Sequence, residues 1–506
     1  MHRRAFLGTA SAAILLAHAG PLRAQGHITS FEDVVAIARE TATAPFARPS
    51  LDLVPPFADL SYDQFRGVRF REDRRLFSGT TFEIDLMPPG LLFEEGVRIN
   101  TSENGETREL DFNSDFYDFQ DNYFNYPDGI PAADSLAFTG VRFRHALNRP
   151  GVMDELLVFQ GASYFRALAR DTLYGLSARG LAIGTGTSDP EEFPNFTRFW
   201  LNAPDADARS VTLLALLDGP SVAGAYEFVV TPGVETEIQV RCILFPRRTI
   251  DNVGLAPLTS MYFFGPERRA GWNDFRDAVH DSDGLEMITG AGERLWRPLV
   301  NPDEVEKSFF ADDGPQRFGL MQRPRDFAFY NDAEARYEMR PSAWVEPIGD
   351  WGPGHVVLVE LPSPNEFADN IVAFWRPESP LVQGNSYEFA YRLIWGKLPE
   401  VTDALARVQA TRIGTSILDE AEWTFALDFD RNQMSGQDLD LDIRASAGTV
   451  RGVNLTELPD GDMLRAAFTF VPDPDVDAVE FRGVLRGETG RASETWLYRW
   501  RARAHL

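Results

Sequence analysis

The sequence predicts an all-β protein made of two β-sandwiches, a large one followed by a smaller one. Short apolar stretches separated by Gly, Pro, Asn and Asp recur along most of the chain, and helical patterns are few. The chain has 506 residues, which is too long for one ordinary domain. Regularly spaced strands resume after a polar break near residue 396, and about a hundred residues of this kind are typical of an immunoglobulin-like sandwich.

The N-terminus has the features of a removable export signal. Arg3 and Arg4 form a twin-arginine pattern, and the small and apolar stretch 8–19 follows them. This stretch is too short to span a membrane, and cleavage can follow either Ala19 or Ala24. No later stretch is long and apolar enough for a span. We therefore expect export by the twin-arginine route and a mature protein that is soluble in the periplasm.

The expected elements follow in chain order. Two helices are predicted near the mature N-terminus, over residues 31–43 and 61–67. Alternating or continuous apolar patterns predict strands over residues 81–86, 141–145, 240–245, 356–361, 370–375, 422–428 and 495–500. These elements divide the chain into a signal peptide over residues 1–24, a large β-sandwich over 25–395, a linker over 396–413 and an immunoglobulin-like sandwich over 414–506.

Composition excludes several classes of function. The net charge of −27 repels phosphate backbones and anionic lipids, so no nucleic acid and no membrane insertion are expected. A neutral sugar polymer is compatible with this charge, although the charge also serves solubility. Cys242 is the one cysteine, lies in an apolar run, and is expected in the core. The chain lacks a nucleophile elbow, a phosphate-binding loop, paired thiolate ligands and clustered histidines, so neither a cofactor nor a metal is predicted.

Aromatic residues are numerous, with 10 Trp, 38 Phe and 13 Tyr. Sugar-binding clefts stack pyranose rings on such side chains, while carboxylates and arginines bind the hydroxyl groups. Most of these rings are nevertheless needed in the core of a large sandwich. Composition alone supports only a large β protein.

Seven collinear segments carry a family resemblance: LSYDQFR (60–66), VFQGASYFR (158–166), YGLSARGLA (174–182), HDSDGL (280–285), FGLMQR (318–323), RPSAWVEP (340–347) and DNIVAFW (369–375). Together they resemble the periplasmic glucan biosynthesis proteins of the G/D type, from about residue 60 to 395. The C-terminal region matches only loosely. The twin-arginine signal resembles that of the D branch more than that of the G branch.

The resemblance implies a large sandwich of the kind found in carbohydrate-active enzymes, and a β-glucan as the partner. The family is associated with osmoregulated periplasmic glucans, whose backbone is β-1,2-linked glucose. Its members resemble glycoside hydrolases or transglycosylases that act with inversion. Such chemistry needs one carboxyl group that protonates the leaving oxygen and another that activates the nucleophile.

The family pattern places the general acid at Asp369 and the general base at Asp281. Tyr337 matches a position that helps to arrange the proton path between water and base. Each assignment has an alternative. Either Asp281 or Asp283 can cap the turn that they share, Asp369 can be a turn residue, and Tyr337 can be an ordinary buried phenol.

Further residues are candidates for binding the glucan: Asp283, Arg323, Arg325, Trp344, Glu346, Trp351 and Trp375. Core packing is an equal alternative for each tryptophan. Glu346 and Glu360 are also competing carboxylates in strand-like settings.

The sequence thus predicts an inverting enzyme that acts on β-1,2-glucan by hydrolysis or by transglycosylation. An alternative is a non-catalytic factor that binds nascent glucan and guides it during synthesis. A weaker third hypothesis is a sandwich module that recruits a membrane glucan synthase. Family members can be dimers, so a homodimer is expected.

Overall fold

The computed structural model describes most of the chain, namely residues 30–103, 106–126, 129–131, 133, 135–267, 273–399, 405–417, 419–430, 434, 438–459, 461–488 and 490–502. The predicted signal peptide lies outside these residues. Nearly all regular structure is β, so the predicted fold class is confirmed.

In the part of the chain that the structure describes, three short α-helices and three 3₁₀ turns accompany the strands: α1 (Phe31–Thr41), α2 (Tyr62–Gly67), α3 (Phe327–Tyr330), η1 (Glu72–Arg74), η2 (Ser114–Phe116) and η3 (Tyr337–Met339). The two predicted helices correspond to α1 and α2. Ser30 and Ser61 begin them, because each serine side chain accepts a hydrogen bond from the backbone of the first turn. No helix in the described ranges is long and apolar enough to cross a membrane.

The first large sheet has ten strands within the described residues. In spatial order they are β2 (Phe82–Met87), β6 (Gly140–His145), β7 (Asp154–Gln160), β8 (Tyr164–Ala167), β9 (Ser177–Arg179), β15 (Val253–Ser260), β24 (Ile371–Pro377), β23 (Gly354–Glu360) and β20 (Glu306–Asp312), with β10 (Leu181–Ile183) also paired to β15.

The second large sheet has fifteen strands, again counted over the described residues. Their order is β28 (Asp440–Ala445), β31 (Ala478–Gly487), β33 (Thr495–Arg501), β19 (Arg294–Pro298), β18 (Gly284–Ile288), β21 (Arg317–Met321), β22 (Ser342–Ile348), β25 (Tyr387–Gly396), β14 (Thr236–Pro246), β13 (Val222–Thr231), β12 (Val211–Asp218), β11 (Asn195–Asn202), β3 (Arg98–Glu103) and β4 (Glu106–Leu110), with β32 (Gly490–Arg491) paired to β31.

The described ranges also contain three smaller sheets: β1 (Val68–Phe70) with β5 (Tyr117–Phe119), β16 (Tyr262–Phe264) with β17 (Val279–His280), and β26 (Val408–Thr415), β27 (Trp423–Asp430), β30 (Met463–Val471) and β29 (Thr449–Glu457) in the order β26-β27-β30-β29. The strands predicted from apolar patterns correspond to β2, β6, β14, β23, β24, β27 and β33.

The main core lies between the two large sheets. Phe159 of the first sheet packs against Phe228 of the second, with ring centroids 5.1 Å apart. Cys242, on β14, is also buried in this core, and burial raises the pKa of its thiol to about 12. These side chains alternate along their strands with more exposed ones, as expected when one face of a sheet is covered.

A second core joins the C-terminal strands to the large sandwich. Phe425 and Phe468 stack inside the C-terminal sheets, and Trp296 and Trp344 of the second large sheet contribute to the same cluster. In addition, β33 pairs in parallel with β19, where Trp496 lies opposite Trp296. The C-terminal strands β28, β31 and β33 are therefore a direct continuation of the large sheet, whereas β26, β27, β29 and β30 form a separate sheet.

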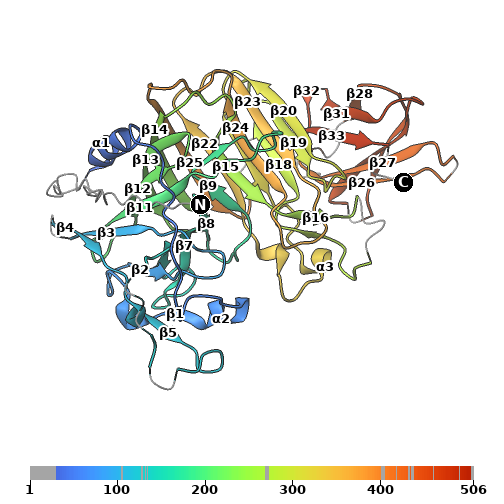
Figure 1. The fold of residues 1–506 in the computed structure, drawn as a ribbon. Helices are drawn as coiled ribbons and strands as arrows, with labels where there is room; N and C mark the ends of the chain where they lie inside the picture. The colour runs from blue at the N-terminus through green and yellow to red at the C-terminus, as the bar shows by residue number, and fades with distance from the viewer. Residues whose placement is uncertain are drawn as a thin grey trace, which may run out of the picture.

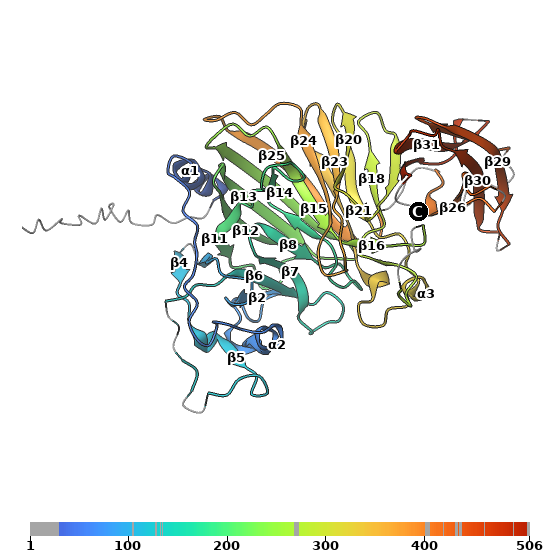
Figure 2. The ribbon, with the colours of Figure 1, turned by 45° about the vertical axis from the view of Figure 1, so that its right-hand side comes forward.

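The arrangement of these parts is visible in two views. α1 and the C-terminal strands lie at opposite ends of the molecule, and β16 and α3 lie between them at the lower edge of the large sandwich (Figures 1 and 2). β26 begins at Val408, inside the predicted linker 396–413. The division into two domains stays a prediction.

Candidate active site

Asp369 lies at the end of a loop that connects β23 to β24. The loop is closed at its base, because the backbone N–H of Leu361 donates to the carbonyl of Asn370 at 2.8 Å. The Asn370 side chain accepts a hydrogen bond from the Tyr262 N–H at 2.8 Å and donates to the Tyr262 carbonyl at 2.9 Å. These bonds fix the backbone next to Asp369 against β16.

The Asp369 carboxylate itself remains accessible, with 29% of its side chain exposed. Its nearest cation is Arg166 on β8, at 3.7 Å, and that side chain is 44% exposed. An ion pair this long between exposed side chains does not hold either side chain in one conformation. The Asp369 carboxylate is therefore accessible to a ligand that binds from solvent.

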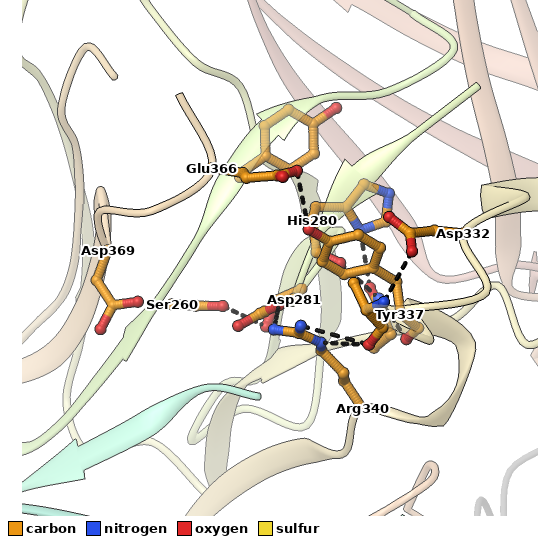
Figure 3. Close-up of polar contacts among 12 residues, drawn as sticks. Ser260, His280, Asp281, Asp332, Tyr337, Arg340, Glu366 and Asp369 are labelled. Carbon is orange, nitrogen blue, oxygen red and sulfur yellow. Dashed lines mark hydrogen bonds and ion pairs between the residues drawn. The ribbon is translucent and has the colours of Figure 1, made fainter. Parts of the chain in front are cut away.

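Asp281 is buried, immediately after β17. Its N–H donates to the carbonyl of Met261 at 2.8 Å, and its carboxylate accepts a hydrogen bond from the Arg340 guanidinium. Burial, together with the nearby charge of Asp369, raises the pKa of Asp281 to about 6, against the lowering effect of Arg340. The two carboxylates are thus close enough to interact. Figure 3 shows Asp369 and Asp281 on either side of Ser260.

Tyr337 connects the surroundings of Asp281 to the loop of Asp369. The Arg340 guanidinium that binds Asp281 also lies over the Tyr337 ring, 4.5 Å from its centroid. The Tyr337 hydroxyl donates to Glu366 at 3.1 Å, and burial raises the pKa of this phenol well above its ordinary value (Figure 3). Asp281, Arg340, Tyr337 and Glu366 therefore form one continuous polar chain.

A cluster around Arg276 fixes the loops that carry this chain. The guanidinium of Arg276 donates to Asp274 at 2.7 Å, to Asp332 at 2.8 Å and to Glu366 at 2.7 Å. We call these four residues the Arg276 cluster. Its members come from the segments before β17, after α3 and before β24. One side chain thus holds together three loops that are far apart in sequence.

Asp283 has surroundings different from those of Asp281. It accepts a hydrogen bond from the Arg323 N–H at 2.9 Å and lines a small cavity with Trp296 and Thr411, beside the C-terminal strands. Burial raises the pKa of Asp283 to about 6, against the lowering effect of Arg323. The turn of residues 281–283 therefore directs its two carboxylates toward different parts of the molecule.

Most of the other predicted sugar contacts lie inside the protein. Trp344 and Trp375 are fully buried, and Trp351 is a core residue that donates to the Ala390 carbonyl at 3.2 Å. Arg323 is buried against Glu494 and Glu286, and Arg325 donates to backbone carbonyls. Glu346, on β22, is paired with Arg317 of β21 and Arg392 of β25. We do not include these side chains in the proposed site, because their polar groups are bound by the protein or covered by it.

Four residues that the sequence analysis did not select belong to the site: Arg166, Arg276, Arg340 and Glu366. Arg166 and Arg340 are the last and the first residues of two segments that carried the family resemblance. Their position within these segments could have identified both arginines as candidate site residues. Nothing local distinguishes Arg276 and Glu366, because their partners are distant in sequence.

A separate cavity of about 630 Å³ is lined by residues that include Phe93, Glu191 and Phe193. None of the candidate catalytic carboxylates lines it. Among the described residues, no three His, Cys, Asp or Glu side chains are grouped so that they could hold a metal ion.

Comparison with known proteins identifies the family. The model of the family described as "Periplasmic glucan biosynthesis protein, MdoG" matches residues 29–500. The chain belongs to this family. It is 42% identical over 474 residues to glucans biosynthesis protein G of Shewanella frigidimarina, covering 93% of this chain and 84% of that protein. It is 43% identical over 476 residues to glucans biosynthesis protein G of Vibrio cholerae strain O395, covering 93% of this chain and 86% of that protein.

These relatives correct one prediction. The twin-arginine pattern favoured the D branch, whereas the relatives carry the G name, so that prediction was wrong. The physical reason is that a removable signal is no part of the folded sandwich. Its route of export carries no information about which branch the folded part resembles.

Proposed function

We propose that this family member is a periplasmic enzyme that acts on the β-1,2-glucan backbone by an anomer-inverting acid/base mechanism. Asp369 is the general acid, Asp281 is the general base, and Tyr337 organises the proton path. The observation that carries the proposal is the pair of interacting carboxylates, one accessible and one buried, at the point where three loops are held together.

The surroundings of Asp281 support its role as base. A carboxylate whose pKa is about 6 holds a proton more strongly than an ordinary aspartate, yet it is still mainly ionised at neutral pH. Arg340 fixes the orientation of the carboxylate through a charge-assisted hydrogen bond. Asp281 is therefore suited to accept a proton from water, directly or through a relay.

The accessibility of Asp369 supports its role as acid. Its side chain can reach a glycosidic oxygen that approaches from solvent. The mechanism requires that this carboxyl carries the proton that it passes to the leaving oxygen when glucan is bound.

Tyr337 supports a proton path that runs beside Asp281. Its hydroxyl is already oriented by Glu366, and its ring lies under the guanidinium that binds Asp281. Whether water or a sugar hydroxyl accepts the glycosyl group depends on how well the bound chain excludes water. Both hydrolysis and transglycosylation are compatible with this arrangement.

The experiment compares the mature wild-type protein with Asp369→Asn on linear β-1,2-glucan. Products are separated by chromatography, and the configuration of new reducing ends is followed by NMR. We expect shortened or rearranged glucan with inverted ends from the wild type only. A β-1,4-glucan run in parallel tests linkage specificity.

A second substrate tests which carboxyl is the acid. Fluoride leaves with little help from an acid, so a β-1,2-gluco-oligosaccharyl fluoride should be turned over by Asp369→Asn but not by Asp281→Asn. The reverse result would exchange the two roles.

The name of the relatives, glucans biosynthesis protein G, is also compatible with an alternative, a non-catalytic factor that binds glucan during its synthesis. Measurable glucan binding without any product, from the wild type as well as from Asp369→Asn, would establish this alternative.

Export by the twin-arginine route is part of the proposal. Replacing Arg3 and Arg4 together by lysine should leave the precursor in the cytoplasm, as cell fractionation would show.

A further inference from the structure

Two phenylalanine rings at the edge of the candidate site are unusually exposed. The side chain of Phe367 is 89% exposed and that of Phe275 is 73% exposed, which makes them the most exposed aromatic residues in the described ranges. Leaving a ring of this size in water forgoes about 1.5–3 kcal/mol of burial free energy. Single exposed apolar side chains are ordinary on a protein surface, so what distinguishes these two is their position on the loops of the candidate site.

Each of the two phenylalanines is adjacent in sequence to a member of the Arg276 cluster. Phe275 precedes Arg276, and Phe367 follows Glu366, whose carboxylate accepts a hydrogen bond from Arg276 at 2.7 Å. This contact brings together two loops that are about ninety residues apart in sequence. Phe275 and Phe367 are therefore carried by two loops that this contact holds together next to the candidate site, where Figure 3 shows Glu366 above Asp281 and Tyr337.

The backbones that carry the rings are ordered by their own hydrogen bonds. The N–H of Phe367 donates to the Asn365 side chain at 3.0 Å. On the other loop, the N–H of Arg276 donates to the Asp274 side chain at 2.9 Å. Ordered backbones present both rings with little loss of conformational freedom when a ligand binds. Phe367 is also only two residues from Asp369, so a ligand on its ring would reach the candidate acid.

The chemistry of the surroundings selects the partner. Carboxylates dominate the Arg276 cluster, with Asp274, Asp332 and Glu366 around one arginine, so an anionic ligand is disfavoured. A glucose ring is neutral, has an apolar face of C–H groups that packs on an aromatic ring, and has hydroxyl groups that donate hydrogen bonds to carboxylates. A glucan chain meets all three requirements.

We propose that Phe275 and Phe367 are stacking platforms that hold glucose units of the glucan chain beside the candidate catalytic carboxylates. This inference rests on the proposed function and specifies how that site binds its substrate. The rings fix the position of the chain, and Asp369 then meets a glycosidic oxygen next to the unit on Phe367.

The test measures binding, separately from turnover. Phe275→Ala and Phe367→Ala are made in the Asp369→Asn protein, and the affinity for linear β-1,2-glucan is measured by isothermal titration calorimetry. We expect each change to weaken binding by about 2- to 12-fold, since an aromatic contact is worth about 0.5–1.5 kcal/mol beyond its area. Phe367→Tyr should keep the affinity because it keeps the ring, and Phe367→Leu should lose it.

Tyr62→Ala is the matched control. Tyr62 is 63% exposed and has Arg66 beside its ring, much as Phe275 has Arg276, but it lies on α2. This variant should bind glucan like its parent.

The outcomes separate the two proposals. Unchanged affinity in both alanine variants, with normal binding by the parent, would overturn the stacking platforms and leave the proposed function standing. Absence of glucan binding by the parent would overturn both. A change in oligomeric state without a change in affinity, detected by light scattering, would show that the rings contact a second copy of the chain and would overturn this inference.

Discussion

At the scale of single residues, the two aspartates of the turn after β17 illustrate how surroundings assign roles. Asp281 interacts with Arg340 and with the charge of Asp369, whereas Asp283 accepts a backbone N–H beside the C-terminal strands. The pKa of each is raised to about 6 by burial. Equal pKa values therefore do not distinguish them, and only Asp281 belongs to the polar chain of the candidate site.

Replacement of these aspartates should separate their roles. We expect Asp281→Asn to lower kcat on β-1,2-glucan by about 10²–10⁴-fold, the range typical of a lost general base. Asp283→Asn should retain most activity, because its amide oxygen can still accept the Arg323 N–H. Steady-state kinetics of both variants check this. Equal losses would contradict the assignment of Asp281 as base.

The pH dependence of activity should report Asp281. The base must be ionised, so kcat/KM should fall below about pH 6, the value to which burial raises the pKa of this group. Arg340 lowers that pKa, and hence Arg340→Gln should move the acidic limb to higher pH. Arg340→Lys keeps the charge and should move it less. A limb that stays in place in Arg340→Gln would show that another group controls it.

The pKa of Asp283 also predicts a pH dependence of stability. Because burial raises its pKa above the unfolded value, the folded protein binds a proton that the unfolded chain releases, and stability falls as pH rises from about 4 toward 6. Asp283→Asn removes this contribution. The variant should gain stability relative to the wild type at pH 8 more than at pH 4, as urea unfolding at both pH values would show.

At the scale of elements, the candidate site is made of loops at the edge of a rigid sandwich. β23 and β24 are paired strands of the first large sheet, and the loop between them carries Glu366, Phe367 and Asp369. The Asn370 side chain fixes one end of this loop to the backbone of β16. Loops on such a scaffold can place side chains accurately without being part of the core.

The Arg276 cluster should control the order of these loops. Arg276→Gln leaves three carboxylates without their shared cation, so we expect faster hydrogen exchange in residues 362–370 and a lower kcat, by about 10-fold or more. Arg276→Lys should recover part of both. Hydrogen-exchange mass spectrometry with parallel kinetics checks the prediction. Unchanged exchange in Arg276→Gln would show that the cluster does not order the loops.

At the scale of the whole molecule, a buried ion pair joins the C-terminal strands to the large sandwich. Arg323 donates to Glu494 at 2.6 Å and to Glu286 at 3.0 Å, and its guanidinium lies 3.4 Å from the centre of the Trp296 ring. The parallel pairing of β19 and β33 lies beside it. Arg323 therefore has a structural role, because it links the C-terminal strands to the large sandwich.

Breaking this pair should be costly. Glu494→Gln leaves Arg323 only partly compensated in the interior, and we expect a loss of about 3–5 kcal/mol in the free energy of unfolding. Glu480→Gln is the control, because its pair with Arg499 is 55% exposed on the glutamate side and should contribute at most about 1 kcal/mol. Urea denaturation of both variants gives the comparison, and similar losses would contradict the structural role of Arg323.

The oligomeric state is also a property of the whole molecule, and the homodimer stays a prediction. Size-exclusion chromatography with light scattering on the mature protein is the direct measurement.

The sequence by itself determined the all-β class, the position of many strands, the two N-terminal helices and the family. These features depend on local information: alternating polarity along residues 81–86, capping serines at positions 30 and 61, and collinear motifs. It also supplied Asp281, Tyr337 and Asp369, which the structure brings into one neighbourhood. Their roles remain a proposal.

Only the tertiary structure decided which polar and aromatic side chains are accessible. Trp344 and Trp375 could pack in the core or bind a sugar, and long-range packing buried both. Arg323 is paired with Glu494, which is 171 residues away in sequence. Arg276 is likewise paired with Glu366, which is 90 residues away. Burial and ion pairing depend on groups that approach only when the sheets assemble, so no local pattern in the sequence contains them.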